Sequence, residues 1–597
     1  QRQMCIRDRS WGVDNSKVSL LFTKITECPS SSLGLITKPF QGDFMAVISL
    51  KTFLEAGVHF GHQTKRWHPK MGPYIYGIKN GVHVIDLRQT LSKLKEAYEY
   101  VKVSAAEGRV PLFVGTKTQI QRIVKEEAER CGSPYINFRW LGGLLTNFGT
   151  VKKSIARMKT FEEIALQIWD YAELGYLENK SSNLLANELE KNGFTIQKGL
   201  AGIPTSFVAE YNNGGPIIGI LGEFDALPGI SQKAIPEKIA LEDGAAGHGC
   251  GHNLFGTASL GAAVAIKNLI SSGKLKGTVK FFGTPAEEKY FGKLWMAREG
   301  LFDDLDICVD WHPADNIEAD VQSSLALIDF KVEFFGQTAH ASADPWNGKS
   351  ASDALELYTH GINMYREHVK PTVRIHYHIQ DGGQVVNVVP DYSRIWVRVR
   401  DIKRDGMNEV YQHVRKMAEG AAIMANVDYK INLISGIHEI LPNRAGGFAV
   451  QKNLEFLGDI KYSEEEKKFA YKIQEATEKP MVGIDGKIKP MRLTEEKPMG
   501  GSTDVGDVSF LVPVVRLGVT TAPKGTPWHS WAVVASGGMS IGHKGMIFAS
   551  KALGMTMIDL FTNSKLREEI KKEFKLRKGD YVYEPMVPPG PPPIGEE

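Results

Sequence analysis

The heptapeptide Gly-His-Gly-Cys-Gly-His-Asn at 247–253 is the feature that most constrains this chain. It places Cys250 and His252 two residues apart in a glycine-rich turn, and the apolar run that follows, Leu254 to Leu269, has the length of a helix. A thiolate and an imidazole are ligands that zinc and related divalent metals accept in proteins. The motif therefore predicts a metal-binding turn at the start of an apolar helix.

Further candidate ligands follow segments that are typical of buried strands. Four apolar runs precede them: 216–221 leads into Glu223 and Asp225, 278–283 into Glu287 and Glu288, 307–310 into His312, and 513–519 into the loop with His529. Open α/β sheets bind ligands beyond the carboxyl ends of their strands, so we expect these side chains to meet in one site.

The residue types at this site indicate its chemistry. A thiolate, three imidazoles and a carboxylate can hold one or two divalent metals; they come from Cys250, His252, His312, His529 and one of the adjacent glutamates. Adjacent side chains point in different directions, so the other glutamate is free to take a proton from metal-bound water and pass it to a leaving amine. The sequence therefore predicts a metal-dependent hydrolase.

A family resemblance extends over residues 164–574. It is carried by seven motifs: Gly222-Glu-Phe-Asp-Ala-Leu-Pro228, Gly247 to Asn253, Pro285-Ala-Glu-Glu288, Trp311-His-Pro313, Ala339-His-Ala341, Ser502-Thr-Asp-Val-Gly-Asp507 and Thr526-Pro-Trp-His529. They resemble the aminoacylase and carboxypeptidase superfamily of dinuclear metallohydrolases, and within it the aminobenzoyl-glutamate hydrolase branch. The resemblance implies an amidohydrolase related to metallopeptidases. Its substrate would be an amide between an acyl or aroyl group and an amino acid, such as an aminobenzoyl-glutamate-like compound, or a dipeptide.

The resemblance also implies a role for individual residues. Glu287 corresponds to the catalytic base and Glu288 to a metal ligand, which completes the set with Cys250, His252, His312 and His529. Asp225 corresponds to the acidic residue that orients a ligand through a hydrogen bond. His340 corresponds to a histidine that helps to hold the substrate or its oxyanion, and Asn387 to a substrate-polarising position.

Two features of this site stay open in the sequence. Glu223 stands where many members of the family place a metal-binding histidine, which leaves its role unassigned. The two divalent metal ions are zinc or manganese, because a thiolate among imidazoles favours zinc whereas the resemblance points to manganese.

An inserted domain is predicted between His312 and His529, at 325–435. Strand-like segments at 326–335, 373–380, 395–400 and 429–434 and helix-like segments at 350–367 and 407–424 give the order βαββαβ. This order is typical of a ferredoxin-like α+β sandwich. It resembles the lid and dimerisation domain of the family, which implies a homodimer or a heteromer with a similar chain.

A different pattern occupies residues 45–163. Strands at 82–87 and 111–115 alternate with helices at 90–107 and 120–131, which favours a parallel sheet. Nineteen Lys and Arg against ten Asp and Glu make this part basic. The motifs at 55–63, 113–117 and 139–143 resemble the bacterial small-subunit ribosomal protein S2 family, which binds ribosomal RNA and has no catalytic activity. The resemblance stops near Glu163, and half a doubly wound sheet leaves an open strand edge, so we expect this part not to fold as it stands.

These segments predict an α/β protein in five parts. They are a disordered or non-native leader at 1–44, the truncated ribosomal-protein-like segment at 45–163, a metallopeptidase catalytic domain at 164–324 and 436–574, the lid at 325–435, and an extended, mobile Pro-rich tail at 575–597. We interpret the abrupt change of motif set near residue 164 as a chimera, from a gene fusion or an assembly error.

Composition excludes several other classes of protein. Five scattered Cys argue against a disulfide framework, and no apolar run has the roughly 18–20 residues of a membrane span, so the expected compartment is the cytoplasm. Two alternative functions remain. One is a ribosomal structural protein that binds rRNA through residues 45–163, and the other is an inactive or regulatory hydrolase-like subunit.

Overall fold

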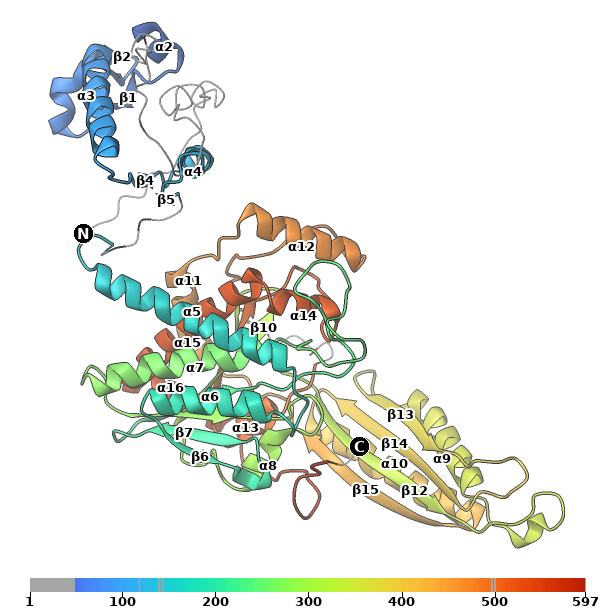
Figure 1. Ribbon diagram of the computed structural model, residues 1–597. Helices are drawn as coiled ribbons and strands as arrows, with labels where there is room; N and C mark the ends of the chain where they lie inside the picture. Colours follow the sequence, from blue (N-terminus) through green and yellow to red (C-terminus); the bar gives the residue numbers. More distant parts are fainter. Residues whose placement is uncertain are drawn as a thin grey trace. The chain divides into compact units, whose positions relative to one another are not determined.

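The computed structural model describes residues 49–595, except 118, 138, 139, 141, 143, 495–497, 499 and 500. The predicted leader at 1–44 and part of the 139–143 motif lie outside the described residues. The chain separates between Ser154 and Ile155 into two compact units (Figure 1). Helix α5 (Phe148–Tyr171) continues across this division, so the predicted change of domain near residue 164 lies within one helix.

The N-terminal unit holds two small sheets. Its elements are α2 (Leu50–Glu55), β1 (Phe60–Gln63), the 3-10 helix η2 (Pro69–Tyr74), β2 (Ile75–Lys79), β3 (Val82–Ile85), α3 (Leu87–Ala106), β4 (Phe113–Val114), α4 (Gln121–Arg130) and β5 (Tyr135–Ile136). Among the described residues the expected parallel pairing occurs between β4 and β5, whereas β3 lies antiparallel between β1 and β2. The reason is local: Asn80 and Gly81 link β2 to β3 with positive φ angles, and so short a turn can only join antiparallel strands.

The second unit is built on a seven-stranded sheet in the order β11-β16-β10-β8-β9-β7-β6. The strands are β6 (Thr195–Lys198), β7 (Phe207–Tyr211), β8 (Ile217–Gly222), β9 (Thr278–Gly283), β10 (Ile307–Ala314), β11 (Glu318–Asp320) and β16 (Val514–Thr520). The four strands predicted to precede the site are present, and they are the parallel centre of the sheet, β16-β10-β8-β9. Strands covered on both faces show continuous apolar runs, which is why the sequence revealed them.

Helices cover this sheet and enclose its core. They are α5, α6 (Asn179–Lys191), α7 (His252–Ser271), α8 (Gly292–Arg298), α11 (Arg444–Leu457), α12 (Glu464–Ala476), α13 (Val505–Leu511), α14 (Trp531–Gly537), α15 (Ser540–Thr562) and α16 (Ser564–Lys578), with a short 3-10 helix η3 (Leu200–Gly202). Helices α7 and α15 pack together against the central strands (Figure 1). Among the described residues, α7 is the one helix long and apolar enough to cross a membrane, but 72% of its apolar window is buried in this core.

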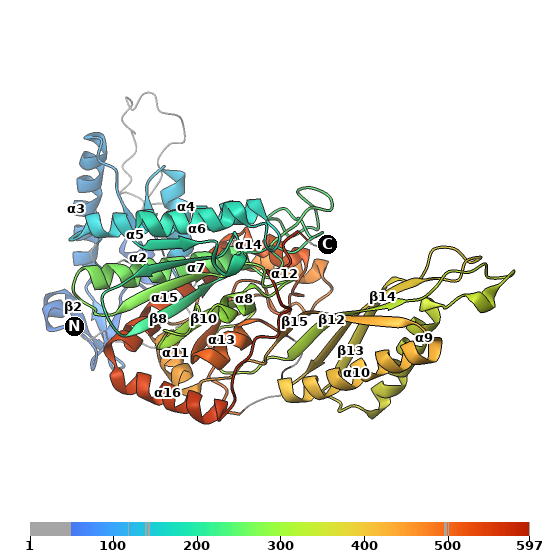
Figure 2. The ribbon, with the colours of Figure 1, turned by 90° about the horizontal axis from the view of Figure 1, so that it is seen from below.

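The inserted domain has the predicted βαββαβ order. Its elements are β12 (Ala326–Phe335), α9 (Ala351–Tyr365), β13 (Arg374–Asp381), β14 (Tyr392–Asp401), α10 (Arg404–Ala425) and β15 (Asp428–Ile437), with 3-10 turns η4 (Pro345–Asn347) and η5 (Arg366–His368). They form an antiparallel sheet, β13-β14-β12-β15, with its own apolar core beneath α9 and α10. Figure 2 shows this lid extending from one end of the catalytic domain. The chain enters the lid at the start of β12 and leaves it at the end of β15.

The C-terminal tail differs in part from the prediction. Helix α16 continues to Lys578, and the following residues are extended, as expected. They are packed against the domain, however, so the expectation of a mobile end is wrong. Gly436 N–H donates to Met586 O (2.7 Å), Arg298 Nη1 donates to Gly590 O (2.8 Å), and Val587 lies against buried apolar side chains.

Candidate metal centre

The predicted ligands meet at the carboxyl ends of the parallel strands. Glu223 and Asp225 follow β8, Glu287 and Glu288 follow β9, and His312 lies in the last part of β10. His252 is the first residue of α7, where Gly251 takes a positive φ of 80° and turns the loop into the helix. His529 lies in the loop after β16 and donates its backbone N–H to Gly249 O (3.0 Å), which joins the two ligand-bearing loops.

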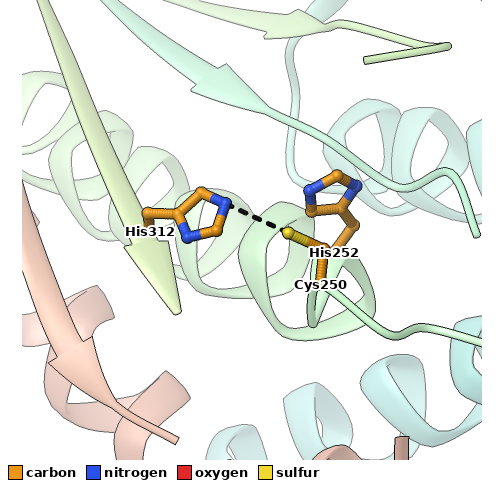
Figure 3. Close-up of side chains that lie close together, drawn as sticks. All are labelled: Cys250, His252 and His312. Carbon is orange, nitrogen blue, oxygen red and sulfur yellow. Dashed lines mark hydrogen bonds between the residues drawn. The ribbon is translucent and has the colours of Figure 1, made fainter. Parts of the chain in front are cut away.

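Cys250 lies between two groups of candidate ligands. One comprises Cys250, His252 and His312, and the other Cys250, Glu288 and His529; in each, the candidate ligand atoms lie within 4.8 Å of one another. Cys250 Sγ is 3.5 Å from His312 Nε2 (Figure 3), close to the ~3.5 Å expected for a sulfur and a nitrogen on one tetrahedral zinc. The side chains therefore fit two divalent ions with the thiolate shared between them.

Hydrogen bonds orient two of the imidazoles. His252 Nδ1 is 2.8 Å from Asp225 Oδ1, and because a carboxylate only accepts, Nδ1 carries the proton and Nε2 presents a lone pair. His312 Nδ1 likewise donates to Pro313 O (2.8 Å), which leaves its Nε2 facing Cys250. The second oxygen of Asp225 accepts the backbone N–H of Glu288 (2.9 Å). Asp225 thus positions a ligand from α7 and another from the β9 loop.

The two adjacent glutamates point to different neighbours. Glu288 Oε2 is 3.4 Å from His529 Nε2, whereas the carboxylate of Glu287 is grouped with Glu223 and His252. The backbone takes part in this separation, because Ala286 before the pair has a φ of 57°, a conformation that costs a residue with a side chain of order 1–3 kcal/mol. Ala286 N–H is held by the buried carboxylate of Glu178 (2.8 Å).

Burial controls the electrostatics of the site. It raises the pKa of Glu287 well above its usual value, helped by the neighbouring Glu223 and Glu288 carboxylates, and it raises the pKa of Glu288 to about 7. Burial also raises the pKa of the Cys250 thiol and lowers the pKa of His312 to about 4. Each of these four shifts opposes the charged form of its group.

Comparison with known proteins identifies the second unit. Residues 219–509 match the model of "Peptidase family M20/M25/M40". One of the subunits of the p-aminobenzoyl-glutamate hydrolase of Escherichia coli K12 is 35% identical over 459 residues, which cover 72% of this chain and 95% of the relative. The chain belongs to the M20/M25/M40 peptidase family.

A solved structure supports the fold of this family member. An aminohydrolase of methicillin-resistant Staphylococcus aureus aligns with a TM-score of 0.52 and 18% identity, covering 68% of this chain and 97% of that one. At this identity the likeness shows the fold alone, which is a metallopeptidase catalytic domain with an inserted ferredoxin-like domain.

A second family model matches the N-terminal part. Residues 53–205 match the model of "Ribosomal protein S2". The small ribosomal subunit protein uS2 of Dictyoglomus thermophilum is 55% identical over 150 residues, but the chain spans only 58% of that relative's length. The predicted chimera of a ribosomal-protein-like segment and an M20 family hydrolase is confirmed.

The two predicted lid residues lie next to each other in the inserted domain. His340 pairs with Val388 in an isolated bridge, and Ala341 N–H donates to Asn387 O (3.0 Å), so His340 and Asn387 belong to neighbouring loops of the lid. Both side chains are exposed, and His340 Nδ1 accepts from the backbone of Ser342 and Ala343 in its own loop. The predicted roles of these two residues stay predictions.

Two charged residues of the M20 unit were not recognised in the sequence. Lys293 in α8 is fully buried, and its Nζ lies 2.6 Å from both Glu223 Oε1 and Asp504 Oδ1. A signal was available: Lys293 is the only charged residue within the apolar segment Phe291-Gly-Lys-Leu-Trp-Met-Ala297. Asp504 belongs to the 502–507 motif, whose spacing gave no hint of this partner.

Proposed function

We propose that the M20 family unit is a metal-dependent amidohydrolase that cleaves an amide between an acyl or aroyl group and an amino acid. The observation that carries the proposal is the convergence of Cys250, His252 and His312 beside the buried carboxylate of Glu287. The Escherichia coli relative belongs to a hydrolase of p-aminobenzoyl-glutamate, and we extend that substrate class, or a dipeptide, to this chain.

The ligand set fits two divalent ions, zinc or manganese. His252 and His312 with Cys250 would hold one ion, and Glu288 and His529 with Cys250 the other. Such ions acidify bound water and polarise the amide carbonyl. Burial alone keeps the thiol protonated, so the thiolate would be maintained by the metal charge.

Glu287 is suited to move the proton of the reaction. Its raised pKa lets the carboxylate take a proton from the attacking water, hold it in a low-dielectric pocket, and release it to the nitrogen of the departing amine. Asp225 stays ionised and accepts the hydrogen bond of His252. Burial opposes its ionisation, but the His252 imidazole beside it holds the pKa of Asp225 below its usual value. His252 consequently keeps one orientation.

Replacement of Glu287 by Gln tests the base assignment. The amide preserves the shape of the carboxylate but cannot take a proton, so turnover should fall about 10²–10⁴-fold while two metals per chain remain bound. Cys250→Ala and His252→Ala should lose metal as well as turnover, and Glu299→Gln, an exposed glutamate at the end of α8, is the matched control. A Glu287→Gln protein that keeps more than about a tenth of the rate would rule out the assignment.

We further propose that the lid completes the site. His340 and Asn387 would hold the substrate once the lid closes or once a second copy presents its lid in a homodimer. A heteromer with a similar chain would serve equally, and the Escherichia coli relative is itself named as one subunit of its hydrolase. The exposed Val385 and Val386 beside Asn387 support a contact surface at this end of the lid.

His340→Ala should lower the catalytic rate by about 10²–10³-fold with metals still bound, as expected for loss of an oxyanion donor. His368→Ala, an exposed histidine of the same domain, is the control. Deletion of 325–435 should give a monomer that binds metal without turnover. An active full-length protein that is strictly monomeric, or a His340→Ala protein at full rate, would contradict this role.

RNA binding is the second candidate function, and the 55% identity of residues in the N-terminal part to protein uS2 favours it. Basic residues that contact phosphates make binding weaken steeply with salt. A gel-shift titration of the full chain with small-subunit ribosomal RNA at two salt concentrations tests it; affinity equal to that for an unrelated RNA would argue against specific recognition. A regulatory hydrolase-like subunit is the third candidate, and measurable turnover by the purified chain alone would exclude it.

A further inference from the structure

Glu223 has one oxygen that no hydrogen bond satisfies. The residue follows β8 directly and is 1% exposed. Its Oε1 accepts a hydrogen bond from Lys293 Nζ (2.6 Å), whereas its Oε2 lies 3.1 Å from His252 Nε2. Both Glu223 Oε2 and His252 Nε2 are buried without a hydrogen-bond partner among the described residues.

The two unsatisfied atoms face each other as acceptors. Asp225 fixes the His252 proton on Nδ1, so Nε2 carries a lone pair and lies 3.1 Å from Glu223 Oε2 without a hydrogen bond between them. Two buried acceptors in contact are unfavourable unless a cation or a proton lies between them. Two ligands on one ion with bonds of about 2.0–2.2 Å are separated by roughly 3.0 Å at an octahedral angle and roughly 3.4 Å at a tetrahedral one, and the 3.1 Å found here lies between these values.

The charges around this contact also favour the binding of cations. Five carboxylates line the site, those of Glu223, Asp225, Glu287, Glu288 and Asp504, and the ammonium of Lys293 is bonded to two of them. Fully ionised, these five carboxylates would exceed the one ammonium by four charges in a low-dielectric pocket, and burial accordingly raises the pKa of Glu287, Glu288 and Asp504 where no cation is present. Two divalent ions would balance them.

We propose that Glu223 is a further metal ligand, on the ion held by His252 and His312. The inference rests on the proposed function, since it concerns the same metal centre. Glu223, His252 and Glu287 form a third group whose candidate ligand atoms lie within 4.8 Å of one another. Lys293 occupies Oε1, so Glu223 binds through Oε2 alone, and Asp504 holds Lys293 in place through Nζ (2.6 Å) and the backbone N–H (3.0 Å).

Metal binding by the full-length chain tests the proposal without use of turnover. The metal-free protein is titrated with Mn²⁺ and, separately, with Zn²⁺ by calorimetry, and bound metal is counted by elemental analysis after gel filtration. Glu223→Gln should lower the affinity for one of the two ions at least about 100-fold and leave the affinity for the other unchanged. This loss is at or beyond the range found when a residue that only hydrogen-bonds to a metal ligand is removed. Two ions bound with wild-type affinity by this variant would overturn the proposal.

A double variant separates a ligand from a counter-ion. Glu223→Gln combined with Lys293→Met removes both charges. If Glu223 only neutralises Lys293, its loss then has no further effect on metal binding. Restoration of both ions at wild-type affinity in the double variant would therefore overturn the proposal, and persistent loss of one ion supports it. Asp504→Asn, which touches Lys293 but leaves both Glu223 oxygens, is the matched control and should keep both ions within about tenfold.

Folding of each variant is checked by its thermal transition without metal. Should the glutamine variants not fold, Glu223→Asp keeps the charge for Lys293 but withdraws the oxygen from His252 by one methylene, and the same loss of one ion is expected. The two proposals fail in different ways. A wild-type chain that binds no divalent ion contradicts the proposed function, whereas a wild type and a Glu223→Asp protein that bind two ions alike contradict only the ligand role of Glu223.

Discussion

The two units of this chain start from similar sequence patterns and reach different degrees of burial. Both alternate strands with helices, but among the described residues only the M20 unit encloses its sheet. Its central strands β8, β9, β10 and β16 are buried almost throughout. The N-terminal unit exposes large apolar side chains instead, among them Phe60 (66%), Tyr76 (71%), Ile78 (63%) and Tyr100 (69%). Within its described residues, the buried apolar side chains are those of Phe53, Ala56, Leu87, Ile123, Val124 and Ala128, and Phe53 and Leu87 form a small cluster.

Helix α5 shows the same contrast within a single element. Its first half exposes Phe148, Ile155 and Met158, whereas its second half buries Ile164 and Ile168 in the M20 core. The helical pattern is continuous, so the difference comes from the elements available to pack against it. A strand or helix pattern thus predicts an element, and burial follows only when the rest of the layer is present.

The second half of α5 also supports the metal loop. Ile168 O is 2.9 Å from His248 Nε2, Ala165 O accepts from Asn253 Nδ2 (3.3 Å), and Trp169 Nε1 donates to Val534 O (2.8 Å). These contacts tie the helix to both ends of the 247–253 motif. The segment nearest to the junction between the two families is therefore part of the hydrolase structure.

The largest expected effect is on the N-terminal unit in isolation. Residues 45–163 expressed alone should show no cooperative unfolding, because too little apolar surface is buried to offset the conformational entropy of the chain. The fragment 155–597 should unfold in one sharp transition. Circular dichroism melts and amide dispersion in NMR spectra measure both, and a sharp transition in the first fragment would remove the contrast.

Removal of α5 should be nearly as damaging to the M20 unit. A fragment that begins at residue 172 loses Phe161, Ile164, Ile168 and Trp169 from the core, and losses of about 2–5 kcal/mol for each large side chain together approach a typical total stability. We expect this fragment to be insoluble or unfolded, whereas the fragment 155–597 binds metal. Equal metal content in the two fragments would show that α5 is dispensable.

Acid should destabilise the two units differently. Burial lowers the pKa of His543 in α15 to about 4, below the ordinary value of about 6.5, so the unfolded chain binds the extra proton and the stability of the M20 unit falls as the pH drops from 6.5 toward 4. At pH 5, this proton uptake by the unfolded chain at His543 lowers the free energy of unfolding by roughly 2 kcal/mol.

Chemical denaturation of metal-free 155–597 and its His543→Gln variant at pH 7.5 and pH 5 measures this effect. The variant should lose less stability between the two pH values. In the N-terminal unit, the exposed Arg88 guanidinium lowers the pKa of the neighbouring Asp86 to about 2, and a surface ion pair of this kind predicts only a weak response of stability to acid. Identical pH dependence of variant and wild type would show that His543 does not contribute.

The smallest effect concerns one hydrogen bond of α5. Trp169→Phe removes the bond from Nε1 to Val534 O, and because Val534 O also accepts the Gly538 N–H (3.3 Å), it keeps one partner. The expected cost is about 1 kcal/mol, with metal content unchanged. Leu166→Ala on the more exposed face of α5 is the control, and equal destabilisation by both variants would deny the bond any particular contribution.

Much of the metal site could be predicted from the sequence. Ligand residues such as Glu288 and His312 follow continuous apolar runs, and such runs become parallel strands whose carboxyl ends converge in any open α/β sheet. The alternation along β14 likewise revealed the lid, because Ile395, Val397 and Val399 face its core while the residues between them do not.

What the sequence by itself determined is the set of residue types and the elements that carry them. Only the tertiary structure decided that Lys293 in α8 and Asp504 before α13 meet at Glu223, although Asp504 lies 211 residues from Lys293 along the chain. It also decided that one half of α5 is buried and the other exposed. The physical reason is the same in both cases: pairing of buried charges and burial of apolar faces depend on which distant elements pack together, and local patterns do not encode that choice.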